Sequence, residues 1–277
     1  MILTSRSPSI SVHAGTDRGR RREKNEDSYN IIQLKNPLMD VTLVVVADGV
    51  GGLEAGELAS RIGSLTFSSD IIDSLIDARI KNLNINDIDI VNFIYQAVND
   101  ANSKVGNALS NAGTTLVAAL MIPGHQVLTY IINVGDSRAY LIDKESWEIY
   151  QLTRDHSVAW TDFEEKELKK FWSKASSADR HKLAQVKFNY IKTHPRAHII
   201  TNVVGYYGKV AGIEIIKIGL DRKDRLLLCT DGLTDMLDDY EIVNIMKESE
   251  DPVGKLIEKA NERGGDDNIT IAIIDIV

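Results

Sequence analysis

The chain has 277 residues, of which 43% are apolar, and a formal net charge of −8 at pH 7; this suffices for one large core, and the acidic balance argues against a protein that binds nucleic acid. No stretch reaches the ~18 uninterrupted apolar residues of a membrane span, and residues 1–8 lack the apolar region of a signal peptide, so we expect a cytoplasmic protein that does not enter a membrane. The single cysteine, Cys229, lies in an apolar run, which argues against a disulfide framework or a zinc cluster of cysteines and predicts a small core residue.

The first feature along the chain is the basic turn "RGRRREK", residues 18–24, which acidic residues interrupt and follow. Its composition fits a solvated turn, and it also fits an arm that binds anions. The residue types alone leave both interpretations open.

Strands and helices then alternate. Residues 42–47 have the length and β-branched content of a strand. Helical spacing follows at Leu58, Ile62 and Leu65 and again at Ile90, Ile94, Ala97, Val98, Ala101 and Val105, and each helix is expected to lay one apolar stripe on a sheet. Strands are predicted at 115–122 and 127–134, and Pro123-Gly124 between them indicates an antiparallel hairpin.

Further strands are predicted at 138–142, 213–218, 225–230 and 269–276. A helix is expected to begin at Asp251-Pro252, to bury Val253, Leu256, Ile257 and Ala260, and to end at Gly264-Gly265. No segment resembles a linker between domains. We therefore predict a tail at 1–9 and one domain at 10–277.

Segment 157–198 is predicted to be a helical excursion from the sheet core. Two capping boxes, Thr161 with Glu164 and Ser176 with Asp179, precede apolar residues in helices rich in lysine and glutamate. Connections of this length are usually functional or mobile. Its aromatic residues fit packing to the core and equally contact with a partner protein: Trp160, Phe163, Phe171 and Trp172.

Aspartates stand beside glycines at four predicted strand ends. Asp48 and Asp231 follow strands and precede glycine, Asp136 follows a glycine after a strand, and the pair Asp266 and Asp267 comes just before the last strand. Each site alone is ordinary turn chemistry. If the strands are neighbours, however, the carboxylates converge, and such a cluster needs a cation to compensate its charge.

Magnesium and manganese are the cations that suit such a cluster, because they take oxygen ligands and need few carboxylates each. A pair of them activates water for attack on phosphorus. Glycines let backbone carbonyls, such as that of Gly49, approach an ion. The alternatives fail on inspection, since the sequence contains no P-loop, no dinucleotide-binding motif, no H-E-x-x-H and no G-x-S-x-G.

Seven segments, in order, resemble the signature blocks of the metal-dependent serine/threonine protein phosphatases of type 2C, in the bacterial style. They are "TDRGRRREKNEDSY" (16–29), "VVVADGVGG" (44–52), "GTTLVAAL" (113–120), "INVGDSRAYLI" (132–142), "LTRDHS" (152–157), "DRLLLCTDGLTDML" (224–237) and "GGDDNITIAII" (264–274). The resemblance implies an α+β fold: a four-layer α-β-β-α sandwich of two mostly antiparallel sheets, with a binuclear metal cleft at one end.

The resemblance also implies roles for individual residues. Asp48 would bridge two manganese or magnesium ions, and Asp231 and Asp267 would hold the first of them. The Gly49 carbonyl would bind the second, which Glu26 or Asp27 would reach directly or through water. Asp136 resembles the acid that, with Asp231, holds a weaker third ion, and Arg22 matches the arginine that grips the substrate phosphate. Arg18, Arg20 and Arg21 keep the interpretation of a solvated turn, and Asn268 is expected to orient its loop by hydrogen bonds.

The implied activity is hydrolysis of phosphoserine and phosphothreonine in proteins by direct attack of water, opposing a serine/threonine kinase. The partners are then phosphorylated proteins, with no nucleic acid and no membrane, and we expect a monomer. The alternative is a weakly active or inactive phosphoprotein-binding module with the same fold, and a less favoured third option is hydrolysis of a small phosphorylated metabolite.

Two departures from the family pattern stand out. Val50 occupies the position of a histidine proposed as general acid in eukaryotic members, and His156 is expected to be structural. Segment 157–198 falls where the family has its mobile flap, but its amino-acid sequence does not match the usual bacterial flap sequence.

Overall fold

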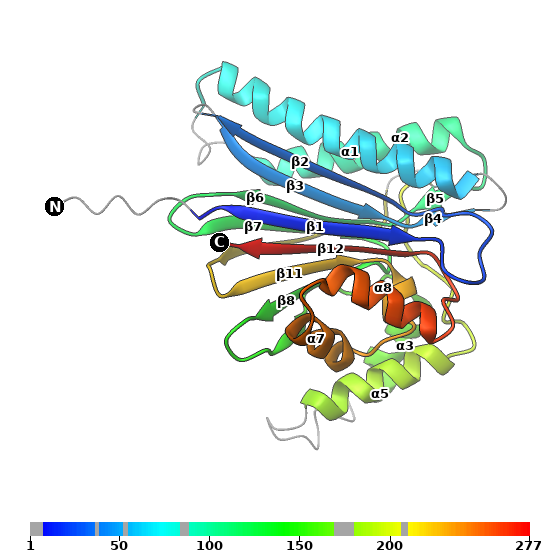
Figure 1. Ribbon diagram of the computed structural model, residues 1–277. Coiled ribbons are helices and arrows are strands. Elements are labelled where there is room, and N and C mark those ends of the chain that lie inside the picture. Colours follow the sequence, from blue (N-terminus) through cyan, green and yellow to red (C-terminus); the bar gives the residue numbers. More distant parts are fainter. Residues whose placement is uncertain (1–7, 37–38, 52–54, 84–88, 169–179, 206–209) are drawn as a thin grey trace.

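Two five-stranded antiparallel sheets form the centre of the molecule, in a computed structural model that describes all residues except 1–7, 37–38, 52–54, 84–88, 169–179 and 206–209 (Figure 1). The first sheet has the spatial order β1 (Ile10–Asp17), β12 (Ile269–Ile276), β11 (Asp224–Cys229), β8 (Arg138–Asp143) and β9 (Ile149–Gln151). The second has the order β10 (Glu214–Leu220), β7 (Val127–Val134), β6 (Leu116–Ile122), β3 (Met39–Ala47) and β2 (Ser28–Asn36). A small ladder joins β4 (Gly49–Val50) to β5 (Gly113–Thr114).

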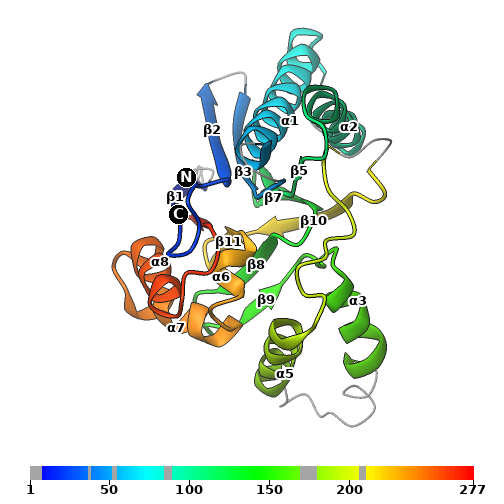
Figure 2. The same ribbon diagram turned by 90° about the vertical axis from the view of Figure 1, so that its right-hand side faces the viewer.

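Helices cover the outer face of each sheet. The second sheet carries α1 (Ala55–Ile80) and α2 (Ile90–Ala108), and the first carries α7 (Asp239–Glu248) and α8 (Pro252–Glu262). The short helix α6 (Asp231–Thr234) follows β11. Figures 1 and 2 show the four layers stacked, and the start of β1 pairs with the end of β12. This arrangement confirms the predicted α-β-β-α sandwich.

The apolar run of β3 explains why its pattern is continuous rather than alternating. Leu43 and Val45 pack against the helices α1 and α2, whereas Val44 and Val46 pack against the facing sheet. All four side chains are fully buried. A strand buried on both faces needs apolar residues at every position, and this is why residues 42–47 were recognisable as a strand. The hairpin predicted at Pro123-Gly124 is also confirmed, because β6 and β7 pair antiparallel across it.

The stripe predicted for the first helix is wrong at two of its three residues, since only Ile62 packs against the core, whereas all six residues predicted for the second helix are buried. Leu58 and Leu65 are 46% and 50% exposed on α1. In its first half the helix instead buries a face of mostly small residues, including Gly63, where a Cβ would lie 2.7 Å from the Thr114 side chain. Close approach of the helix to the sheet therefore decides which face is buried in the first half of α1. The second half continues that face with apolar residues at helical spacing: Phe67, Ile71 and Leu75.

The excursion contains α3 (Val158–Phe163), the π-helical turn η2 (Glu164–Leu168) and α5 (Arg180–Thr193), which confirms its helical character. The capping box at Thr161 is wrong, because Ser157 caps α3 by accepting a hydrogen bond from the amide of Trp160. Phe163 is 2% exposed and packs on Tyr190, so it belongs to the core of the excursion. The second predicted box and two of the aromatic residues lie outside the described residues: Ser176, Asp179, Phe171 and Trp172.

Candidate metal centre

The elements that carry the predicted site residues meet at one end of the sandwich (Figure 2), and Asp48 lies there near Asp27, Asp231, Asp267 and Asp136. There β3 ends at Asp48, β11 leads into Asp231 at the start of α6, and the segment before β12 carries Asp267. The turn between β7 and β8 contributes Asp136, and the β1–β2 loop contributes its own acidic residues just before β2. The convergence expected from four strand ends is therefore present in the fold.

Asp48 is held at the end of β3 by two threonines. Its amide donates to Thr115 Oγ1 at 2.9 Å, and its carbonyl accepts from the Thr115 amide at 2.8 Å and from Thr114 Oγ1 at 2.9 Å. The backbone is thus fixed on both sides, and the carboxylate is left to face the other acids.

The Asp136 turn is tied to the same threonine. Thr115 Oγ1 and Ser137 Oγ lie 2.7 Å apart, and Gly135 adopts φ of +116°, with the Thr115 side chain where a Cβ would be. Only glycine tolerates this conformation at such close approach. The Gly135 amide donates to His156 Nδ1 at 3.1 Å, so His156 has the structural position that its sequence context indicates.

Asp27 uses one carboxylate oxygen for hydrogen bonds and leaves the other unpaired. Thr230 Oγ1 and Thr270 Oγ1 donate to Asp27 Oδ2 at 2.9 and 2.6 Å. Asp27 Oδ1 is buried without a hydrogen-bond partner, as is Asp231 Oδ1. Each acid therefore presents a free, desolvated oxygen.

Glu26 and the Gly49 carbonyl lie against the same residue, Gly56, at the start of α1. A Cβ at Gly56 would lie 2.5 Å from Glu26 Oε1 and 2.9 Å from the Gly49 oxygen. Glu26 Oε1 is itself buried and unpaired. Gly56 therefore allows two oxygens to share one small space, a role that the sequence reasoning missed.

Asn268 organises the loop beside Asp267. Its side-chain oxygen accepts from the Glu26 amide at 2.8 Å, and its side-chain nitrogen donates to the carbonyls of Arg18 and Lys24, both at 2.8 Å. The predicted orienting role of Asn268 is confirmed. Arg22 Nη2 donates to Asp267 Oδ2 at 2.6 Å, which places this guanidinium at the edge of the acidic cluster.

Burial and mutual repulsion raise the pKa values of the clustered acids. Desolvation is the largest cause for Asp27, whose pKa rises to about 7, and for Asp231, whose pKa rises to about 6. The pKa of Asp48 lies well above its usual value because of burial first and then repulsion from Asp27, Asp231, Asp267 and Asp136. Asp48 therefore lies at the electrostatic centre of the cluster.

These shifts predict how the stability of the metal-free protein depends on pH. An aspartate whose folded pKa is raised stays protonated in the folded state at pH values where the unfolded chain has released the proton. For Asp27 and Asp231 this window runs from the ordinary value of 3.8 up to about 7 and about 6. The free energy of unfolding in a chelator is therefore expected to fall as pH rises through this window. Urea denaturation in a chelator at several pH values measures this free energy of unfolding. A free energy that rises with pH through the window would contradict the prediction.

The structure adds two features that sequence reasoning missed. Asp235 lies half-buried one helical turn after Asp231, and desolvation and then repulsion from Asp231 raise its pKa to about 8. Its i+4 spacing from Asp231 was the signal available in the sequence.

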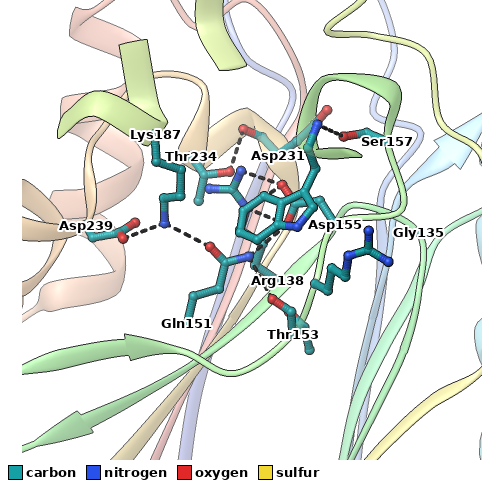
Figure 3. A network of polar contacts seen from close by, with 12 residues as sticks. Gly135, Arg138, Gln151, Thr153, Asp155, Ser157, Lys187, Asp231, Thr234 and Asp239 are labelled. Carbon is teal, nitrogen blue, oxygen red and sulfur yellow. Dashed lines mark hydrogen bonds and ion pairs between the residues drawn. The ribbon is translucent and has the colours of Figure 1, made fainter. Parts of the chain in front are cut away.

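A second feature is the network around Arg138. Arg138 donates to both carboxylate oxygens of Asp155, and Gln151 and Lys187 extend this network towards the excursion (Figure 3).

The donor set fits hydrated magnesium or manganese. Four acids of the cluster have a buried oxygen without a hydrogen-bond partner: Glu26, Asp27, Asp136 and Asp231. Within the part of the chain that the structure describes, no three carboxylates, histidines or cysteines form a group that would hold a metal by themselves. Ions that keep several waters need only one or two carboxylates each, so an open set of this kind suits them better than a closed zinc site.

Two other predictions concern the rest of the chain. Cys229 is buried in the core and its pKa is raised to about 12 by burial, so it is the inert core residue that the sequence indicates. Among the helices described, none has both the length and the apolar character needed to cross a membrane.

Comparisons with known proteins show the family of the chain. The family model described as Protein phosphatase 2C matches residues 14–268. The serine/threonine phosphatase stp of Listeria welshimeri is 34% identical over 269 residues, covering 94% of this chain and 93% of that protein. The structure of the S. agalactiae serine/threonine phosphatase aligns with a TM-score of 0.74 at 26% identity, over 97% of this chain and all of that one. The catalytic domain of the phosphatase PstP, in complex with two manganese ions, aligns with a TM-score of 0.68 at 26% identity, over 98% of this chain and 100% of that one.

Proposed function

Because the chain belongs to the protein phosphatase 2C family and is a serine/threonine protein phosphatase, we propose that the acids at the end of its sandwich hold two divalent cations, manganese or magnesium. The similar protein with two bound manganese ions supports this number. The observation that carries the proposal is the set of buried, unpaired carboxylate oxygens around Asp48. The names of the similar proteins do not favour the alternative of a binding module without turnover.

We assign the candidate metal ligands to two groups that share Asp48. Asp231 and Asp267 would hold the first ion, and Asp48 would bridge both. Of the two acids that the sequence left open for the second ion, Glu26 is the better candidate, because its free Oε1 lies with the Gly49 carbonyl against Gly56. Asp27 faces Thr230 and Thr270 instead. Asp136, with its own unpaired oxygen, would hold a third, weaker ion together with Asp231.

When bound, such ions neutralise charge on a phosphoryl group and lower the pKa of the attacking water. The protein's own contribution is position. The two threonines fix the backbone of Asp48, Asn268 fixes the loop of Glu26, and Arg22 offers a guanidinium fork whose geometry matches two phosphate oxygens. Arg22 now pairs with Asp267, so it would exchange part of this pairing for the substrate phosphate.

We also propose the wider context of the enzyme. Residues 10–277 form one catalytic domain, a proposal that is supported by cores shared between sheets and helices along the whole chain. Because helices of the same chain cover both sheets, a monomer is the simplest state. The acidic charge supports protein substrates rather than nucleic acid, and a single buried cysteine suits the cytoplasm. The enzyme would oppose a serine/threonine kinase.

The test is metal-dependent turnover. Purified protein with excess manganese is expected to hydrolyse p-nitrophenyl phosphate and a phosphothreonine peptide, and a chelator is expected to abolish both activities. The conservative variant Asp136→Asn should retain turnover but require more manganese, because it removes a ligand of the weaker ion only. The matched control is Asp143→Asn, a strand-end aspartate at the other end of β8. Absence of hydrolysis with saturating manganese and magnesium would contradict the proposed function.

A further inference from the structure

The basic loop, residues 18–24, is the most strongly charged feature that the catalytic proposal leaves largely unused. It carries five cationic side chains and one glutamate in seven residues, in a chain whose net charge is −8. Every residue of the loop except Gly19 is exposed. A concentrated positive patch on an acidic protein is suited to an anionic partner.

The loop is fastened to the metal-binding segment. Gly19 adopts φ of +79°, and a Cβ there would lie 2.1 Å from the carbonyl oxygen of Asp267. The amide of Arg20 donates to the Gly265 carbonyl at 2.8 Å. In Figure 2 the blue loop between β1 and β2 lies beside the red segment that leads into β12. The backbone is therefore held at the edge of the acidic cluster.

The arginines of the loop differ in how far their charge is already neutralised. Arg22 pairs with Asp267, and Arg21 pairs with Asp266 at 2.9 Å. Arg18 donates only to the Glu23 carbonyl at 3.3 Å. Arg20 has no hydrogen bond or ion pair from its side chain to any described residue. Arg18 and Arg20 thus hold positive charge that pairs with no carboxylate of the described residues, and they flank Gly19, which lies against the Asp267 carbonyl.

We propose that the basic loop binds acidic residues that flank the phosphorylated serine or threonine of a protein substrate. This inference rests on the proposed function, because the phosphoryl group must sit among the metals and Arg22 for its flanks to reach Arg18 and Arg20. The exposed arginines would add electrostatic attraction outside the site of reaction. They would therefore select among phosphoproteins and contribute little to a small phosphate ester.

The experiment compares phosphothreonine peptides that carry three glutamates or three alanines, placed on the N-terminal or the C-terminal side. We expect the glutamate peptide to have the higher kcat/KM on one side, by about three- to fivefold at low salt, as exposed ion pairs allow. Ionic strength of about 0.5 M should remove this preference. Rates for p-nitrophenyl phosphate, which has no flanking residues, normalise each variant for general loss of activity.

Variants of the basic loop show which residues cause the preference for the glutamate peptide. The double variant Arg18→Gln, Arg20→Gln should bring the ratio of the two kcat/KM values close to one, and Arg20→Lys should keep most of it. The matched control is Arg222→Gln, an exposed arginine in the turn before β11, at the opposite end of that strand from Asp231. A ratio near one in the wild-type protein on both sides, or a ratio that the double variant leaves unchanged, would overturn the proposal.

Failure of the proposed function would give a different result. In that case the wild-type protein would not hydrolyse p-nitrophenyl phosphate with manganese. Binding of the same peptides, measured by fluorescence anisotropy, would still compare the glutamate and alanine sequences and would still test the basic loop.

Discussion

Replacement of Asp48 by asparagine is expected to lower manganese-dependent hydrolysis by about 10³-fold or more, since metal ions supply several kcal/mol of transition-state stabilisation. The same variant should make the metal-free protein more stable. Asp48 is half-buried among acids, and desolvation and then repulsion from these acids raise its pKa. An amide has the same shape and carries no charge, so the folded state no longer has to desolvate this carboxyl group or keep it protonated beside the other acids.

Thermal unfolding with and without manganese measures both effects. In a chelator, the variant should have a higher Tm than the wild type. With manganese the order should reverse, because only the wild type gains the binding free energy of the full site. Asp77→Asn, which removes an exposed acid from the outer side of α1, is the control and should change neither result. If the metal-free variant had a lower Tm than the metal-free wild type, the inference that the neighbouring acids destabilise the protein at Asp48 would be contradicted.

Residues of the metal centre were predictable where local sequence and chemistry agree. Asp48 and Asp231 follow strands whose apolar runs are continuous, because both faces are buried. Their neighbouring glycines reflect a close backbone approach, such as that of Gly49 to Gly56. Resemblance to the family then assigned a role to each acid, which periodicity and spacing do not provide.

Other features could not be predicted from the sequence, because tertiary contacts determine them. The strands β1 and β2 have mixed polar and apolar residues, since they lie at sheet edges and are only partly buried. The N-terminal half of the buried face of α1 consists largely of small residues, among them Gly63 against Thr114, which hydrophobic spacing does not reveal. The partner of Arg138 is likewise invisible, because a carboxylate 17 residues away reaches it only in the folded chain.

The ion pair of Arg138 with Asp155 is expected to contribute most to stability among the polar contacts near the site. Both side chains are buried, and three hydrogen bonds of 2.6–3.0 Å join them. Arg138→Met leaves the Asp155 carboxylate without its cation in the interior. Removal of one partner of a buried pair costs about 3–5 kcal/mol, and urea denaturation of the variant should show a loss of this size.

A double-mutant cycle separates the pair from the loss of one residue. Asp155→Asn alone should also destabilise the protein, because it leaves a buried guanidinium, although the Gln151 side chain still contacts this position. The variant with both changes should lose less than the sum of the single losses, since neither charge remains unpaired. Lys144→Met, which weakens a more exposed pair with Asp275, is the control and should cost at most about 1 kcal/mol. Losses that simply add would mean that Arg138 stabilises the fold through contacts other than Asp155, such as its 5.9 Å approach to the Trp160 ring at the start of the excursion.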